Sequence, residues 1–202
     1  KLREYGDQLS NKEVNELSKE IDNFEESLLE EAASKLAEWN VSVNYDELDL
    51  TVVDSQEDVS HLDEYVDITN NAAYVPNENE ILLLTYESRL VSSRSNAFTH
   101  TVHEMKHHDQ DKRYEKENPA VKEAIPHFLE FYMKKPIENQ YQREKKSQSL
   151  RDSPYPQSER LAEEFELGLK VYDNLKETGM DDNEVIEFLL NEYDERRWNS
   201  TD

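Results

Sequence analysis

The sequence contains no cysteine, only three glycines and six prolines, and no long run of apolar residues. The absence of cysteine excludes disulfide frameworks and thiolate chemistry. The scarcity of glycine excludes collagen-like and glycine-rich architectures. The longest apolar runs, such as Ile81 to Leu84, have four residues, far fewer than the roughly 20 that span a bilayer. A chain of 202 residues with this composition suits one globular domain.

Positive charge is also scarce, because 23 Lys and Arg residues face 47 Asp and Glu residues, for a formal net charge of −24. Such a surface repels nucleic-acid phosphates and anionic lipids, so we expect neither nucleic-acid nor membrane binding. It attracts basic peptides and divalent cations. The chain begins at Lys1 and shows no signal peptide. We therefore expect a soluble protein whose N-terminus arises by processing or truncation.

The spacing of apolar residues predicts a mostly helical chain with a small sheet. Alternating apolar residues indicate strands within 41–54 and within 72–86, the second region broken by a polar turn at 77–79. The segment 144–157, rich in serine and proline, is predicted to be a long loop. Apolar residues at intervals of three to four predict five helices, over 11–39, 92–116, 119–134, 157–178 and 181–198.

One motif in the helix predicted over 92–116 indicates metal chemistry. It reads His103-Glu104-Met105-Lys106-His107, or H-E-x-x-H. Residues four apart on a helix stack on one face about 6 Å apart, so both imidazoles can reach one Zn²⁺ ion. Glu104 is displaced from that face and is placed to act on a water activated by the metal. We therefore predict that His103 and His107 bind zinc and that Glu104 is the general base.

A catalytic zinc site also needs a third protein ligand and an open position for water. The downstream candidates are Glu159, Glu123 and His127. We favour Glu159, because a helix that begins near 157 presents it in the first turn, with Glu163 one turn above it. Glu163 would then hydrogen-bond a metal ligand from outside the coordination sphere. Pro126 disfavours regular helix around Glu123, which makes Glu123 the alternative ligand.

These motifs resemble those of zincin metallopeptidases of the gluzincin kind, in which H-E-x-x-H and a glutamate from a later helix bind zinc. The segment E-R-L-A-E-E-F from Glu159 is similar to the E-x-x-A-[DEN]-x-F stretch of lethal-factor-like and phage-repressor-cleaving enzymes, which implies Glu159 as the ligand. The segment E-A-I-P-H-F-L-E from Glu123 resembles the E-G-x-A-x-[FY]-x-E stretch of aminopeptidase-like gluzincins, with Ala124 in place of glycine. Family members often add an oxyanion-stabilising tyrosine near the third ligand, which implies Tyr155.

The resemblance implies an α+β, mostly helical fold: a zincin-like small sheet with a backing helix, an active-site helix and a glutamate helix. We expect a single domain over 1–202, in which 11–116 hold the backing helix, sheet and active-site helix and 117–202 form a helical lower part. The predicted function is zinc-dependent hydrolysis of peptide bonds, as an endopeptidase. Two alternatives are a non-catalytic zincin-shaped structural or interaction module and an acidic DNA mimic. Metal content separates them, because the module would have a closed four-ligand site and the mimic no metal.

Overall fold

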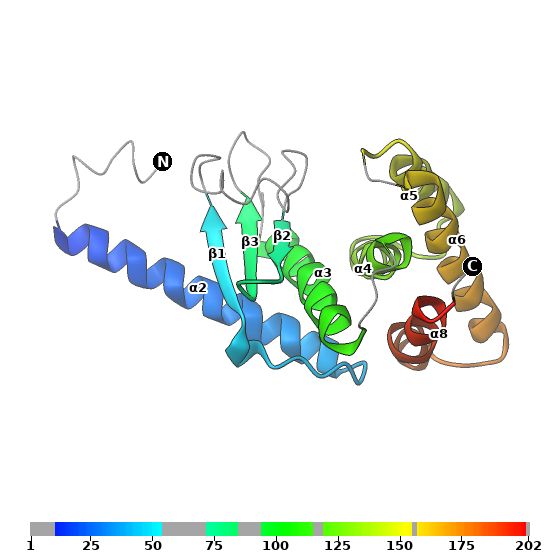
Figure 1. The fold of residues 1–202 in the computed structure, drawn as a ribbon, viewed down its shortest axis with the longest axis horizontal. Coiled ribbons are helices and arrows are strands. Elements are labelled where there is room, and N and C mark those ends of the chain that lie inside the picture. Colours follow the sequence, from blue (N-terminus) through cyan, green and yellow to red (C-terminus); the bar gives the residue numbers. More distant parts are fainter. Residues whose placement is uncertain (1–10, 54–71, 85–93, 115–118, 155–156, 201–202) are drawn as a thin grey trace. The chain divides into compact units, whose positions relative to one another are not determined.

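The computed structural model describes residues 11–53, 72–84, 94–114, 119–154 and 157–200, with the backbone alone described at 11–15, 17 and 18. Over these ranges the fold is α+β and mostly helical, with one small mixed sheet (Figure 1). The chain divides into two compact units, one formed by 1–32 and 44–101 and the other by 33–43 and 102–202. This division falls inside two helices, whereas the sequence suggested a change of architecture after residue 116.

The first unit contains the sheet and most of the long helix α2 (Asn11–Ala37). Its strands are β1 (Asp49–Val53), β2 (Ala72–Val75) and β3 (Glu80–Leu84), in the order β1-β3-β2. Strand β1 is parallel to β3, and β2 is antiparallel to β3. The predicted strand–turn–strand within 72–86 is therefore confirmed as a hairpin.

The strand predicted to start near residue 41 is shorter than expected. Residues 41–44 are irregular, and Tyr45–Glu47 form a short 3-10 helix (η2), so β1 begins only at Asp49. The apolar alternation at Val41 has a different cause. Asn40 adopts a left-handed conformation with φ of 55°, and the amide of Val41 donates to the carbonyl of Leu36 at the end of α2. Val41 is buried there as part of a helix terminus, not of a strand.

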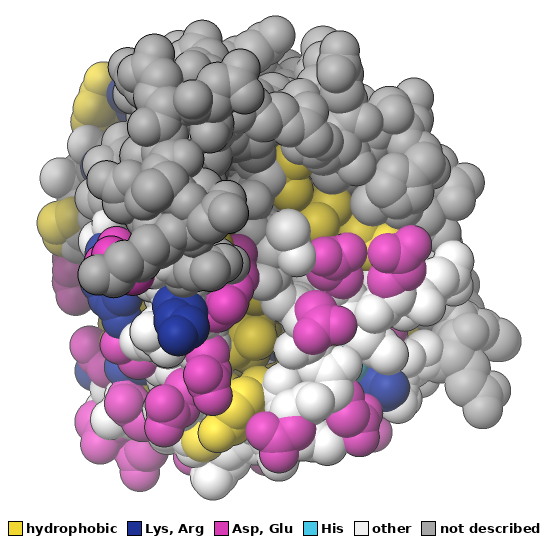
Figure 2. Space-filling view, turned by 90° about the vertical axis from the view of Figure 1, so that its left-hand side faces the viewer, with side chains coloured by type: hydrophobic (Ala, Val, Ile, Leu, Met, Phe, Trp, Pro, Cys, Tyr) yellow, Lys and Arg dark blue, Asp and Glu magenta, His cyan; other side chains and the backbone are white. Residues whose placement is uncertain are grey.

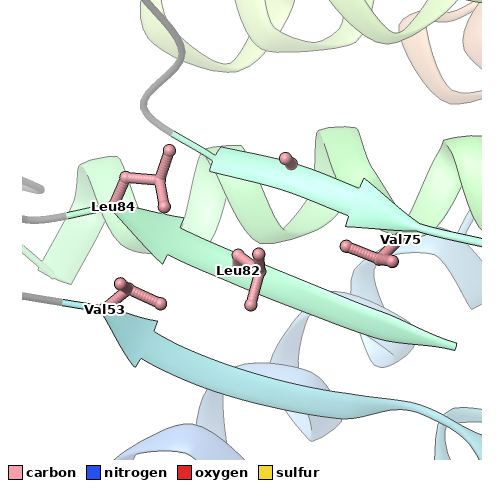
Figure 3. Close-up of a cluster of buried hydrophobic side chains, with 5 residues drawn as sticks. Val53, Val75, Leu82 and Leu84 are labelled. Carbon is pink, nitrogen blue, oxygen red and sulfur yellow. The ribbon is translucent and has the colours of Figure 1, made fainter. Parts of the chain in front are cut away.

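Strand β3 is buried on both faces, which explains why it is a continuous apolar run and not an alternating one. Side chains of alternate residues point to opposite faces of a strand. On one face, β3 and its two neighbouring strands form a cluster of buried apolar side chains (Figure 3). The cluster contains Val53, Ala73, Val75, Leu82 and Leu84. This cluster gives the small sheet its own apolar core.

The second unit is built from helices. Helix α3 (Arg94–Arg113) begins in the first unit and continues into the second. Helices α4 (Pro119–Lys134) and α6 (Ser158–Glu177) follow it along the chain. These three confirm the predicted helices to within three residues at each end. The last predicted helix is a continuous helical run in three parts, α7 (Asp182–Phe188), the π-helix η5 (Leu189–Tyr193) and α8 (Asp194–Trp198).

The loop predicted over 144–157 is wrong for most of its length, because α5 spans Gln140–Arg151. Its sequence lacks an apolar stripe, and charged contacts with α6 hold it instead. Arg143 makes two hydrogen bonds to Asp173, at 2.6 and 2.8 Å, and Arg151 lies 2.8 Å from Glu166. A helix stabilised in this way gives no hydrophobic period that sequence reasoning can detect.

On the face shown in Figure 2, acidic side chains outnumber basic ones among the described residues. This distribution agrees with the formal net charge of −24. None of the helices in the described ranges is both long enough and apolar enough to cross a membrane.

Candidate metal centre

The two histidines of the H-E-x-x-H motif are buried on one face of α3. The side chains of His103, Glu104 and His107 are each less than a tenth exposed. The ring centroids of His103 and His107 lie 5.0 Å apart, as one helical turn requires. Two imidazoles thus meet in a largely dry environment, where a bound cation would interact strongly with its ligands.

Glu123 of α4 completes a set of three possible ligands. Its Oε2 lies 3.7 Å from Nε2 of His107. His103, His107 and Glu123 each offer one ligand atom, and these three atoms all lie within 4.8 Å of one another. Two imidazole nitrogens and one carboxylate oxygen form the kind of ligand set that catalytic zinc sites use.

The sequence of α4 explains why Glu123 faces the histidines. Glu123, His127 and Glu130 follow one another at spacings of four and three, so they form a polar stripe along one side of the helix. Much of the rest of the helix surface is apolar and buried, with the residues Ala120, Val121, Ala124, Ile125, Pro126, Phe128, Leu129 and Phe131. Burial of that larger surface orients the helix and directs the polar stripe to α3.

The expectation that Pro126 interrupts the helix around Glu123 is wrong. Helix α4 runs through Pro126, which is buried inside it. Proline removes one amide donor from the helix interior and costs about 3 kcal/mol there. Packing of the apolar side of α4 offsets this cost, so Glu123 lies on regular helix.

The electrostatic coupling of Glu123 and His107 favours their charged forms. Burial raises the pKa of Glu123, but the neighbouring His107 and His127 outweigh burial and lower the pKa to about 2. Burial lowers the pKa of His107, but the carboxylates of Glu123 and Glu104 outweigh it and leave the pKa above its usual value. Glu123 is therefore an ionised carboxylate at neutral pH, the form that binds a metal.

Glu159, the favoured third ligand, lies elsewhere. It occupies the first turn of α6 as predicted, but its side chain is 68% exposed and Oε1 lies 3.0 Å from Nε of Arg151. Neither group of possible metal ligands among the described residues includes it. The physical reason is α5, whose last residue, Arg151, faces the start of α6 where we expected a loop. The structure thus brings Glu123 to the histidines instead of Glu159.

The other two predicted site residues also lack support from the structure. Glu163, expected to hydrogen-bond a metal ligand, is exposed. The buried carboxylate of that turn is its neighbour Glu164, which binds Arg197 of α8, with Oε2 2.9 Å from Nε. Tyr155, the predicted oxyanion-stabilising residue, lies outside the described residues.

A second group of possible ligands, formed by His103, His127 and Glu130, is less suited to a cation. Oε1 of Glu130 lies 2.7 Å from Nζ of Lys134, and Oε2 lies 3.7 Å from Nζ of Lys146. Burial raises the pKa of Glu130, but His127, Lys146, His103 and Lys134 together hold it far below its usual range. Each ammonium would repel a metal ion by roughly 4 kcal/mol per unit charge at 4 Å, for an effective dielectric constant of about 20. The first group therefore fits a metal better.

Comparison of the chain with protein-family models, curated proteins and solved structures finds no significant match. The candidate metal centre therefore depends on the residues and geometry of this chain alone.

Helix α3 is also held by buried charged contacts beside the histidines that the sequence did not reveal. Lys106, inside the H-E-x-x-H motif, is fully buried, and its Nζ lies 2.6 Å from Asp109 and 2.8 Å from Asp194 of α8. The same Nζ donates to the carbonyl of Leu190 at 3.1 Å, within the π-helix η5. Gln110 donates to Asp194 at 3.2 Å. These contacts tie the motif helix to the end of the chain.

We expect Lys106→Met to lower the free energy of unfolding by about 3–5 kcal/mol, because it leaves the buried carboxylate of Asp194 without its cation. Urea unfolding followed by circular dichroism measures the change. The matched control is Lys112→Met, at an exposed lysine of the same helix, which should change the free energy by no more than about 0.5 kcal/mol. Equal effects of the two substitutions would contradict the role of Lys106.

Sequence reasoning missed Glu130, Lys146 and Lys106 around this centre. The spacing of Glu123, His127 and Glu130 was available as a signal, since three polar residues on one side of an otherwise apolar helix indicate a buried polar site. No comparable signal marked Lys106 or Lys146. Lysine is common on exposed helix surfaces. Lys106 is buried through contacts with α8, far along the chain, and Lys146 is partly buried through contacts with α4.

Proposed function

We propose that this protein is a zinc-dependent peptidase whose metal ligands are His103, His107 and Glu123. The observation that carries the proposal is the convergence of these three side chains, the histidines buried and Glu123 partly exposed, with ligand atoms within 4.8 Å of one another, next to the carboxylate of Glu104. The donor set suits zinc, because imidazole nitrogen is a poor ligand for calcium or magnesium but a good one for Zn²⁺. Three protein ligands leave a coordination position for water or substrate.

A zinc ion held by these residues supplies Lewis-acid polarisation of the scissile carbonyl and lowers the pKa of water to about 7. The remaining chemistry belongs to the protein. Glu104 follows His103 directly in the sequence and shares the buried environment of the histidines. As general base it takes a proton from the attacking water, and as general acid it delivers that proton to the leaving amine.

The charge of the protein indicates the class of substrate. With a formal net charge of −24, long-range attraction favours basic peptides over acidic ones and raises their rate of encounter. This preference should weaken as salt concentration rises, because salt screens charges separated by more than about 10 Å.

The test is hydrolysis of a lysine-rich fluorogenic peptide library by purified protein. We expect activity that is lost on chelation and restored by stoichiometric zinc. The double variant His103→Ala, His107→Ala should contain no zinc by elemental analysis and should not regain activity. Zinc retained by this variant would overturn the ligand assignment, and hydrolysis that survives chelation would overturn the proposed mechanism.

One observation favours a second candidate function, a structural zinc module. The ring of His127 lies 4.8 Å from that of His103, near enough for a fourth ligand to close the site. A closed site would leave no position for water. The visible absorption of the cobalt-substituted protein separates the two, because added inhibitor or anion shifts the spectrum of an open site and leaves that of a closed site unchanged.

A further inference from the structure

An ion pair joins the two helices that supply the proposed metal ligands. Asp111 lies on α3 one helical turn after His107, and Lys122 lies on α4 directly before Glu123. Nζ of Lys122 lies 2.7 Å from Oδ1 of Asp111, and the two side chains are 19% and 24% exposed, respectively. This distance is that of a charge-assisted hydrogen bond. The pair therefore bridges α3 and α4 beside the ligands without belonging to the ligand set.

Each of these two charges lies at the end of its helix where that charge is unfavourable. Asp111 is in the last turn of α3, and Lys122 is in the first turn of α4, which starts at Pro119. The helix dipole favours cations in a last turn and anions in a first turn. The preferences of the individual helices therefore explain neither residue, and the reason for both lies in the contact between the helices.

The ammonium of Lys122 acts on the ligands themselves. Burial raises the pKa of Glu123, but neighbouring positive groups, Lys122 among them, lower it to about 2. Burial and Lys122 lower the pKa of His107, although neighbouring carboxylates outweigh both. A charge that reaches both ligands also reaches a cation held by them, and it repels a divalent ion twice as strongly as a monovalent one. Lys122 by itself would therefore weaken metal binding.

The carboxylate of Asp111 offsets this repulsion. It holds the ammonium at 2.7 Å, so the two charges together act on a metal ion as a dipole and not as a full positive charge. The pair also ties the two helices together, but an ion pair with access to solvent stabilises a fold only modestly. The larger consequence is electrostatic, because the net charge beside the ligands depends on Asp111.

We propose that Asp111 is a positioning residue of the metal centre, which holds the ammonium of Lys122 and compensates its charge so that a divalent cation can bind at the neighbouring ligands. The inference rests on the metal site of the proposed function, but it does not require peptide hydrolysis. It demands that the two members of the ion pair have opposite effects on metal binding. A pair that only ties the helices together would give the same effect from either member.

A competition titration with a chromophoric chelator at low salt measures the zinc affinity of the parent protein and three variants. Asp111→Asn should weaken zinc binding about 10–100-fold, the usual loss when a group that supports a metal site is removed. Lys122→Met should bind zinc at least as tightly as the parent protein, because it removes a positive charge. The double variant should recover most of the affinity that Asp111→Asn loses, because no uncompensated ammonium remains.

The matched control is Asp173→Asn. Asp173 also pairs with a cation of a neighbouring helix, Arg143 of α5, at 2.6 Å, and its replacement should leave zinc affinity unchanged. Equal losses of zinc affinity in Asp111→Asn and Lys122→Met, with no recovery in the double variant, would overturn the inference, because the pair would then act only as a tie between helices.

Failure of this inference can be told apart from failure of the proposed function. Equal zinc affinities of the parent protein and Asp111→Asn, in a protein that hydrolyses peptides, overturn the role of Asp111 alone. The expected pattern of affinities, in a protein that hydrolyses no peptide, supports the role of Asp111 and overturns the proposed peptidase. A parent protein that binds no zinc overturns both.

Discussion

Replacing Glu123 with alanine is expected to abolish stoichiometric zinc binding, whereas Glu159→Ala should leave it intact. Glu123 lies 3.7 Å from His107 and has a pKa of about 2, so it contributes a full negative charge to the candidate metal centre. Its loss removes one of the three proposed ligands. We expect zinc affinity to fall by more than about 10²-fold, beyond the 10–100-fold effect of residues that only orient ligands. Elemental analysis and a competition titration with a chromophoric chelator measure the change.

Glu159 is the matched control for this experiment, because it is a helix glutamate in an ion pair, with Arg151, and is 68% exposed. If zinc survives in Glu123→Ala and disappears in Glu159→Ala, the third ligand is Glu159, as the lethal-factor-like resemblance implies, and not Glu123. Loss of zinc in both variants would indicate an effect on folding, which circular dichroism of each variant would detect.

The second large effect is expected from Glu104→Gln. The amide has nearly the same shape as the carboxylate but cannot accept a proton at neutral pH, so this substitution removes the proposed general base alone. We expect bound zinc at one equivalent and a decrease in kcat of about 10²–10⁴ on a peptide that the parent protein cleaves. KM should change little, because Glu104 acts on water and not on the binding of substrate.

Glu192→Gln is a suitable control, since Glu192 is 63% exposed and pairs with Arg196. It should retain both zinc and activity. A full rate in Glu104→Gln would remove Glu104 from the mechanism. Loss of zinc in that variant would instead indicate that Glu104 is a ligand, although it does not belong to the group formed by His103, His107 and Glu123.

The sequence was a good guide to those parts of the fold that depend on local patterns. The helix over 119–134 was predicted with the bounds of α4, because Pro119 opens it and apolar residues recur at helical spacing. The helix predicted over 157–178 ends as α6 does, before Gly179, whose φ of 94° is a conformation that glycine adopts without strain. Helix α5 was missed because its stabilising contacts, such as Arg143 with Asp173, join residues 30 positions apart.

The sequence by itself determined two of the candidate ligands, His103 and His107, but not the third. His103 and His107 lie one helical turn apart on any helix, so their convergence needs no tertiary information. The third position was a choice among several acidic residues, because helical periodicity says which residues share a face but not which helix that face meets. Tertiary packing decided in favour of Glu123. Burial of the apolar side of α4 directs its polar stripe to α3, while α5 places Arg151 against Glu159 and holds that carboxylate in solvent.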